Sequence, residues 1–424
     1  MKKKYIIFFI VTLVLLVALI TSFNYFKTTN AYIDDSVNNQ TKITKGISMN
    51  LEQTAGAGDY KTVTRSSWPT EGYKFNAELS RCENGSTLSW DDTKKAVIVS
   101  GNLSDKCYVY FDIYQPTLAE YIKSQYTGTQ GENSLYYHNS SLTNGAGDNS
   151  YRYAGASDSV NNYICLGSDE ATCPDANLFR IIGVFGDKTK VIRAKSVGNQ
   201  KWHTSESNTW SSSSLNAYLN GTYLTSLGTI AEKIATTTWK VGGCSWSNIE
   251  TSVPKIVYKN EVGSSASTTT VDKKIGLMYI SDYYYSASPS AWTLVGYNKS
   301  DATKDYSAAK TINWLYLGSK EWTISRVSDE TFSAFIVDGS GHVFSYNVNF
   351  SNFAVRPSFN LDSTVTYVSG DGTKSNPIRI NWLTDSFEKT PVKPGQNGVK
   401  SLTYVERITS FFVLWCGYNR CKYG

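Results

Sequence analysis

The chain has 424 residues, with 41 Lys or Arg and 36 Asp or Glu, and a formal net charge of +5 at pH 7. Lys2, Lys3, Lys4 and Lys27 carry four of these positive charges. The rest of the chain is therefore close to neutral, which disfavours nucleic acid as a partner. The 30 Tyr and 11 Trp, with many Ser, Thr, Asn and Gly, predict a mainly β (α+β) protein, because these residues suit twisted sheets and turns.

An apolar run from Tyr5 to Phe23 follows the N-terminal lysines. At about 1.5 Å per residue, a helix of this length can cross a hydrocarbon core about 30 Å thick. Because flanking lysines stay in the cytoplasm, residues 1–27 are predicted to be a transmembrane anchor, with the remainder of the chain extracellular. A cleaved signal peptide is the alternative, since small residues follow from Thr28 to Ala31, but the apolar run exceeds an ordinary signal core.

Two composition shifts follow the anchor. Residues 28–66 are polar and lack a sustained apolar period, which predicts a stalk or linker. Residues 67–115 are predicted to form a small antiparallel β module, because short alternating apolar runs are separated by turn sequences. Its four strands are expected at residues 73–75, 87–90, 96–99 and 107–111.

Residues 116–162 are predicted to be a connector. Its start should form a short helix, because Leu118, Tyr121 and Ile122 recur at helical spacing. The segment 128–162 is dense in Gly, Asn, Ser and Tyr, which predicts either an ordered surface loop or a flexible junction.

Residues 163–381 are predicted to form a second, larger domain. It opens with a hairpin of strands 178–185 and 190–194, followed by short helices around 215–219 and 229–234. Residues 382–424 are predicted to be a weakly ordered tail. The remaining strands of the domain are expected at 274–280, 322–325, 332–337, 343–348, 354–361, 364–368 and 377–380.

Seven cysteines are an odd number, so at least one has no partner within the chain. In an extracellular compartment the others can oxidise, and closing a loop of the size between Cys82 and Cys107 would stabilise the fold by about 3 kcal/mol. Seven unpaired thiols are the alternative, because sequence does not fix connectivity. Spacing leaves Cys244 over and groups the rest as Cys82 with Cys107, Cys165 with Cys173, and Cys416 with Cys421.

Four blocks in the second domain resemble an uncharacterised extracellular domain that recurs in surface proteins of gut Gram-positive bacteria. They are residues 275–283, 321–326, 354–361 and 369–377, and the third contains a Val-Arg-Pro strand ending. The resemblance covers about residues 178–380. It implies a C-type-lectin-like fold, shared with formylglycine-generating enzymes and retroelement-diversified receptors, but it implies no activity.

The sequence offers little for catalysis. The formylglycine-generating relatives use active-site cysteines, yet no cysteine lies between Cys244 and Cys416. His138, His203 and His342 show no metal-ligand spacing, so no metal site or cofactor is predicted, and no calcium loop is present. A Cys244 thiol with His203 or His342 as its base is conceivable, but a buried spare thiol is the simpler interpretation.

Glycoside hydrolysis would need two facing carboxylates, and their separation cannot be read from a sequence. The candidates are better explained as turn-forming or solvated charges. They are Asp282, Glu321, Asp329 and Asp338. Arg356 precedes Pro357 on a strand that should be internal, which predicts a buried ion pair.

Ligand binding requires fewer specifically placed residues than catalysis, because aromatic side chains in polar loops can stack on sugars or anchor a protein. The predicted function is therefore a membrane-anchored bacterial surface protein whose large domain binds a glycan or a protein. A cell-surface carbohydrate-active hydrolase and a non-catalytic structural surface protein remain the alternatives. The predicted ligand-binding residues are Tyr283, Tyr284, Tyr285, Trp292, Tyr346, Phe350 and Phe353. The alternative is that half or more of these aromatic residues belong to the core, an interpretation that is less clear for the run from Tyr283 to Tyr285.

Overall fold

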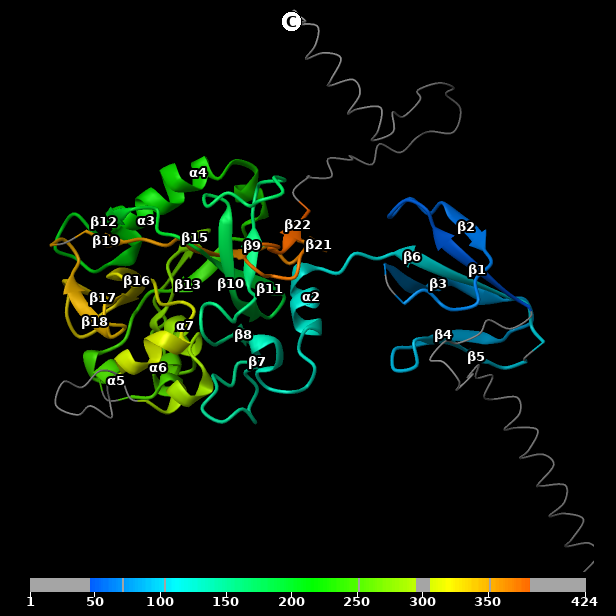
Figure 1. The fold of residues 1–424 in the computed structure, drawn as a ribbon, viewed down its shortest axis with the longest axis horizontal. Coiled ribbons are helices and arrows are strands. Elements are labelled where there is room, and N and C mark those ends of the chain that lie inside the picture. Colours follow the sequence, from blue (N-terminus) through cyan, green and yellow to red (C-terminus); the bar gives the residue numbers. More distant parts are fainter. Residues whose placement is uncertain are drawn as a thin grey trace, which may run out of the picture. The chain divides into compact units, whose positions relative to one another are not determined.

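A computed structural model describes residues 46–381, except 71, 103, 251, 295–305 and 351. In this part of the chain the protein is mainly β, with several sheets and short helices (Figure 1). The predicted anchor, the start of the stalk and the predicted tail with Cys416 and Cys421 lie outside the described residues. Within them, no helix is both long enough and apolar enough to cross a membrane.

The first six strands form a small module with its own core. A four-stranded sheet has the order β2-β1-β6-β3, and β4 pairs with β5 in a separate hairpin. Side chains such as Met49, Val109 and Phe111 fill the core. The strands are β1 (Ile47–Glu52), β2 (Tyr60–Val63), β3 (Tyr73–Cys82), β4 (Thr87–Asp91), β5 (Ala96–Ser100) and β6 (Cys107–Ile113).

The disulfide between Cys82 and Cys107 is confirmed, and it joins paired residues of β3 and β6. The prediction that the module starts at residue 67 is wrong, because β1 and β2 lie within the predicted stalk. Ile47, Met49 and Leu51 alternate with polar residues and face the core, and this short period-2 pattern marks a strand within the polar segment. The module is also not purely antiparallel, since β1 pairs with β6 in parallel.

The large domain is built on a central sheet of seven strands. Its order is β15-β20-β11-β10-β8-β7, and β9 also pairs with β10. The predicted hairpin is confirmed as β10 and β11, and all but one residue of β10 are buried, as its near-continuous apolar sequence requires. The strands are β7 (Leu135–Tyr137), β8 (Tyr151–Tyr153), β9 (Tyr163–Cys165), β10 (Leu178–Phe185), β11 (Lys188–Arg193), β15 (Ile275–Gly276) and β20 (Ser358–Leu361).

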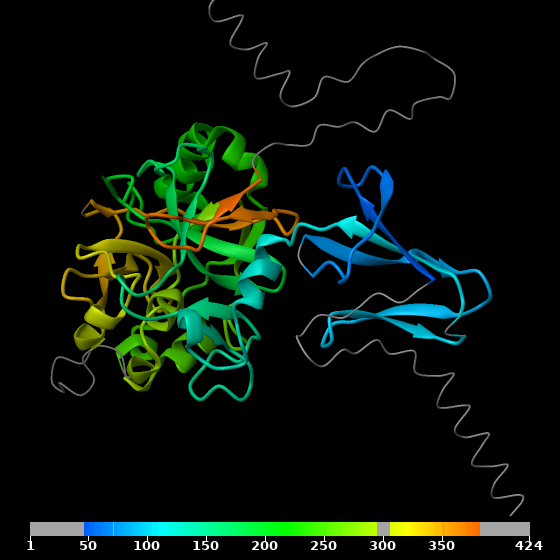
Figure 2. The ribbon, with the colours of Figure 1, turned by 45° about the vertical axis from the view of Figure 1, so that its right-hand side comes forward.

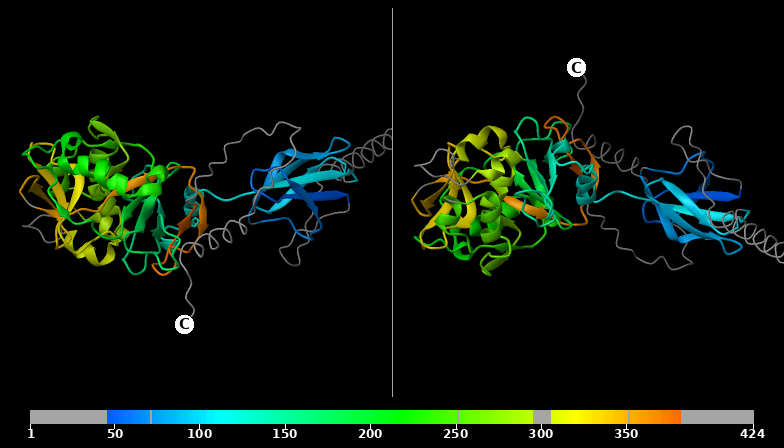
Figure 3. Two further views of the ribbon diagram at one scale, coloured as in Figure 1. Left: turned by 90° about the horizontal axis from the view of Figure 1, so that it is seen from above. Right: turned by 90° about the horizontal axis from the view of Figure 1, so that it is seen from below.

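A second sheet of five strands has the order β12-β19-β16-β17-β18. Figure 3 shows β16–β18 at the end of the large domain opposite α2 (Leu118–Ser124), in the views from above and from below. Two hairpins, β13 with β14 and β21 with β22, complete the strands. Their bounds are β12 (Asn199–Gln200), β13 (Thr237–Lys240), β14 (Thr270–Lys273), β16 (Glu321–Arg326), β17 (Ser333–Val337), β18 (Val343–Asn347), β19 (Phe353–Ala354), β21 (Tyr367–Ser369) and β22 (Arg379–Ile380).

Short helices surround these sheets (Figure 2). The predicted helix near residue 118 is confirmed as α2, which begins with a Thr117–Glu120 capping box. Single turns of 3-10 or π helix extend several of the others. The remaining α-helices are α3 (Ser214–Tyr218), α4 (Leu224–Ser226), α5 (Trp246–Glu250), α6 (Pro254–Glu261) and α7 (Ile280–Tyr285).

Three predicted boundaries in this domain are wrong. Segment 116–162 is part of the domain, because α2 contributes core residues and β7 and β8 extend the central sheet. The strand expected at 274–280 ends at Gly276, and helix α7 begins at Ile280. The strand expected at 354–361 is divided into β19 and β20, because Pro357 lacks the N–H that a continuous ladder needs.

Candidate binding pocket

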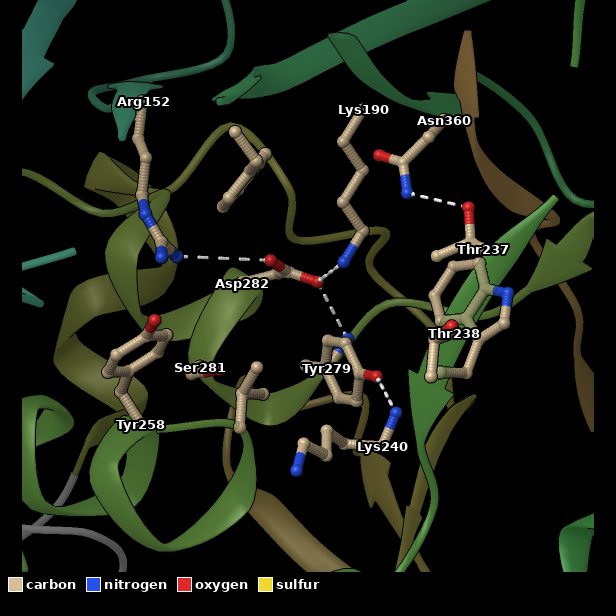
Figure 4. A pocket seen from close by; sticks show the side chains of 13 residues that line it. Arg152, Lys190, Thr237, Thr238, Lys240, Tyr258, Tyr279, Ser281, Asp282 and Asn360 are labelled. Atoms are coloured by element: carbon tan, nitrogen blue, oxygen red, sulfur yellow. Dashed lines mark hydrogen bonds and ion pairs between the residues drawn. The ribbon is translucent and has the colours of Figure 1, made fainter. Parts of the chain in front are cut away.

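A cavity of about 170 Å³ lies where the central sheet meets the β13–β14 hairpin and helices α6 and α7. Its walls come from segments that are far apart in the sequence, and Figure 4 shows the Arg152 and Lys190 side chains pointing toward Asp282. This convergence makes the cavity the candidate functional site. The lining residues are Arg152, Phe185, Lys190, Thr237, Thr238, Trp239, Lys240, Tyr258, Tyr279, Ser281, Asp282, Val262 and Asn360.

The start of helix α7 fixes Asp282 in the cavity. Its carboxylate accepts a hydrogen bond from the Tyr279 N–H at 2.8 Å, which caps the first turn. The Glu261 carboxylate on α6 accepts the next two N–H groups, those of Ile280 and Ser281, each at 2.9 Å. Burial raises the pKa of Glu261, while these hydrogen bonds oppose the shift. The backbone of α7 thus holds Asp282 in one orientation.

Lys190 reaches the same carboxylate from β11. Its ammonium forms a direct ion pair with the Asp282 Oδ2 atom, and both side chains are almost fully buried. The ammonium also lies 4.5 Å from the ring centroid of Tyr279 and 5.4 Å from that of Trp239, which adds cation–π attraction. Burial lowers the pKa of Lys190, and the charge of Asp282 opposes that shift.

Arg152 reaches the cavity from β8. The close pairing of β8 with β10 requires Gly183, because a Cβ at this position would lie 2.2 Å from the Tyr151 carbonyl oxygen. The Arg152 guanidinium donates to the Asp148 carboxylate at 2.6 Å and to the Ser150 hydroxyl at 2.8 Å. Burial would raise the pKa of Asp148, but the adjacent Arg152 charge lowers it below its usual value.

Arg152 also contacts aromatic rings and the central carboxylate. Its guanidinium carbon lies 4.7 Å from the Phe185 ring centroid and 5.0 Å from that of Tyr285. Its Nη1 atom is 3.9 Å from the Asp282 Oδ1 atom, which is beyond hydrogen-bond distance. Asp282 therefore sits between two buried cations, one bonded directly and one held nearby.

Four of the predicted ligand-binding residues are in the core. Tyr283, Tyr284, Tyr285 and Trp292 are each at most 1% exposed, so they do not lie on an exposed loop face, and the alternative that such aromatic residues belong to the core holds for these four. Helical spacing does not divide the three tyrosines of α7 into a buried and an exposed set, because all three pack against the interior. The Tyr283 hydroxyl donates to the Gly341 carbonyl, and the Trp292 indole N–H donates to the Ala287 carbonyl.

The other three predicted residues lie together near the end of β18. Phe350 is 76% exposed, whereas Phe353 is buried and packs edge-to-face on Tyr346 with centroids 4.9 Å apart. The Lys320 ammonium lies over both of those rings. These residues are not part of the cavity.

The acidic candidates separate into different environments. Glu321 forms a bidentate ion pair with Arg356, with both oxygen–nitrogen distances at 2.7 Å, which confirms the predicted buried pair. Asp338 accepts the N–H groups of Ser340 and His342 in the β17–β18 turn, as turn chemistry predicts. Asp329 accepts the N–H of Trp246. Of the four, Asp282 lines the cavity.

The cysteines and histidines that the structure describes lie outside the cavity and do not form a shared site with it. The disulfide between Cys165 and Cys173 is confirmed, and Cys244 is a buried free thiol whose pKa burial raises well above its usual value. His138 is fully buried beside Trp292, and burial lowers its pKa well below the usual range. Among the described residues, no group of three or more His, Cys, Asp or Glu side chains could hold a metal ion.

Comparison with known proteins adds one family. Residues 186–363 match DUF6273, a domain of unknown function. The matched range includes Lys190, the β13 wall and Asp282, while Arg152 and Phe185 precede it. No curated protein and no solved structure matches the chain. The DUF6273 match therefore shows what residues 186–363 are similar to, and it carries no activity.

Sequence reasoning did not single out Arg152 or Lys190. Each lies within a short strand among apolar or aromatic neighbours, as Tyr151-Arg152-Tyr153 and Lys190-Val191-Ile192. A charged residue at an inward position of a core strand is rarely buried without a partner. That pattern could have marked both residues, although it could not have named Asp282 as their shared partner.

Proposed function

We propose that this chain is an exported, membrane-anchored bacterial surface protein whose large domain, of C-type-lectin-like type, binds a glycan or protein ligand. The pocket around Asp282 is the proposed site, in place of the aromatic loop face expected from the sequence. The observation that carries the proposal is the convergence of Arg152, Lys190 and Asp282 beneath aromatic walls. Pockets with apolar walls and a few convergent polar groups are the usual form of ligand sites.

The lining favours binding over turnover. Its residues include neither Cys nor His, and Asp282 is the one carboxylate among them. Glycoside hydrolysis needs a second carboxylate across the substrate, and the other buried candidate, Glu321, is bonded to Arg356. Two disulfides support export, because such bonds persist in oxidising compartments.

The test uses the full chain in detergent micelles, applied to glycan arrays and to arrays of host and bacterial surface proteins. Thr238→Trp should block the pocket, because Thr238 is exposed at its rim and a large side chain there needs no change in the core. Thr270→Trp is the matched control, since Thr270 is exposed on the partner strand β14 and does not line the cavity. We expect array binding that survives Thr270→Trp and is lost with Thr238→Trp.

Binding that survives both substitutions would refute the pocket as the site. Binding lost with Phe350→Ala instead would return the site to the β18 end of the domain. Release of a cleaved glycan would move the protein to the hydrolase class. No binding to either array would favour a structural surface protein.

A further inference from the structure

The charges that face the pocket are unequal. Arg152, Lys190 and Lys240 line it as cations, and Asp282 lines it as the single carboxylate. Asp148 bonds Arg152 from outside the lining and balances one further charge. Glu261 also lies behind the wall, where its carboxylate accepts the N–H groups of Ile280 and Ser281. Among the residues that line the pocket, three cations therefore accompany one carboxylate.

Hydrogen-bond donors are also in excess. A guanidinium has five N–H donors, and Arg152 directs one to Ser150 and one to Asp148, which leaves three without a hydrogen-bond acceptor among the described residues. Lys190 directs one of its three donors to Asp282. Buried donors are normally satisfied, so an acceptor-rich group, whether water or ligand, belongs in this space.

One acceptor in the pocket wall needs a donor in return. The Asn360 side-chain nitrogen donates to the Thr237 hydroxyl, but the Asn360 Oδ1 atom is buried without a hydrogen-bond partner in the described chain. A bare carboxylate offers acceptors only and cannot satisfy this oxygen. A ligand that carries hydroxyl groups beside a carboxylate supplies both kinds of partner.

We infer that the pocket receives the carboxylate-bearing sugar residue of an acidic glycan. This inference rests on the proposed binding function and names its ligand class. The carboxylate would accept from the planar Arg152 guanidinium and from Lys190, while ring hydroxyls would donate to Asn360. The cavity of about 170 Å³ has room for roughly five or six water molecules, which is the scale of one sugar ring.

Lys240 provides the least disruptive test. It lies at the edge of β13, is only partly buried, and shares in no ion pair found among the described residues. Replacing it removes one pocket charge and leaves the buried Arg152–Asp282–Lys190 group unchanged. Lys273 is the matched control, because it lies on the partner strand β14 with similar exposure and does not line the pocket.

The experiment measures binding of single sugars to the full chain in detergent by saturation-transfer NMR and calorimetry. The acidic probes are glucuronic, galacturonic and N-acetylneuraminic acid. The neutral probes are glucose, galactose and N-acetylglucosamine, and the peptide Gly-Phe supplies a carboxylate without a sugar ring. We expect at least one acidic sugar to bind more tightly than every neutral probe, with affinity that falls as salt rises. Lys240→Gln should weaken that binding by up to about five-fold, and Lys273→Gln should leave it unchanged.

Each other result overturns the inference. Equal binding of neutral and acidic sugars would show that charge does not select the ligand, while leaving the pocket as a glycan site. Tighter binding of Gly-Phe would reassign the site to peptide carboxylates. Binding of none of the acidic sugars would refute the ligand class, and the array experiment would then decide separately whether the pocket binds anything.

Discussion

Removing Arg356 should destabilise the large domain more than most single substitutions. Arg356 and Glu321 are 3% and 1% exposed, and two hydrogen bonds of 2.7 Å join them. Arg356→Met keeps the volume of the side chain but leaves the Glu321 charge buried without its cation. Loss of one member of a buried ion pair costs about 3–5 kcal/mol, against a total stability of about 5–15 kcal/mol.

Two measurements check this magnitude. For a domain of this size, a loss of about 3–5 kcal/mol lowers the unfolding midpoint by about 6–20 °C in calorimetry of the full chain. Burial raises the pKa of Glu321, and the Arg356 charge is what opposes that shift. In the variant the folded state therefore binds a proton more readily than the unfolded state, so its stability deficit should shrink as the pH falls from 8 to 5.

A double-substitution cycle supplies the control. Arg356→Met with Glu321→Leu removes both charges and should cost less than Arg356→Met alone, because no unpaired carboxylate remains. A midpoint shift below about 2 °C for Arg356→Met would refute the reasoning. A double variant whose cost equals the sum of the single costs would also refute it, since the two side chains would then be energetically independent.

Three further predictions address other parts of the chain. Thiol labelling of the native protein should miss the buried Cys244 and should modify the four paired cysteines only after reduction; labelling of native Cys244 would contradict its burial. Because burial lowers the pKa of His138 in the folded state, only the unfolded state gains this proton below about pH 6.5. The free energy of unfolding should therefore fall there by at most about 1.4 kcal/mol per pH unit. Urea unfolding of His138→Gln at several pH values should lack that part of the slope. A fragment that starts at residue 128 should be less stable than one that starts at residue 116 by about 3–6 kcal/mol, because it lacks the buried Leu118 and Ile122. Equal urea unfolding midpoints for the two fragments would show that α2 contributes nothing to the core.

Strong local patterns allowed much of the fold to be predicted. The continuous apolar run of β10, the turn after it and the β17–β18 hairpin are set by neighbouring residues. The two disulfides could be predicted because each joins cysteines that are close in the sequence compared with the other possible pairings. The buried role of Arg356 was predicted from an internal strand, and Arg356 is buried although it lies between β19 and β20. Strands such as β7 and β8 were missed because each has three residues, too few for a period-2 pattern to stand out from a polar loop.

The candidate site was beyond the reach of sequence alone. Asp282 was weighed as a catalytic carboxylate, but its partners lie 92 and 130 positions away along the chain. The local pattern can mark Lys190 on β11 as a buried charge, but it does not identify the partner, because that depends on which strand and helix cover it. Long-range pairing, through the order β20-β11-β10-β8, decides that Lys190 and Arg152 face the same carboxylate.

The aromatic residues show why ligand sites are better sought by unused hydrogen-bonding capacity than by aromatic content. The Tyr285 hydroxyl donates to the Asn144 carbonyl and the Tyr283 hydroxyl to the Gly341 carbonyl, so each of these two rings ties a loop to the core. In a chain with 30 Tyr, many rings must serve packing. Arg152 and Asn360 instead retain donors and an acceptor that the described chain does not satisfy. Because burying an unsatisfied polar group is costly, the Asn360 oxygen and the remaining Arg152 donors at the wall of this cavity favour a polar occupant.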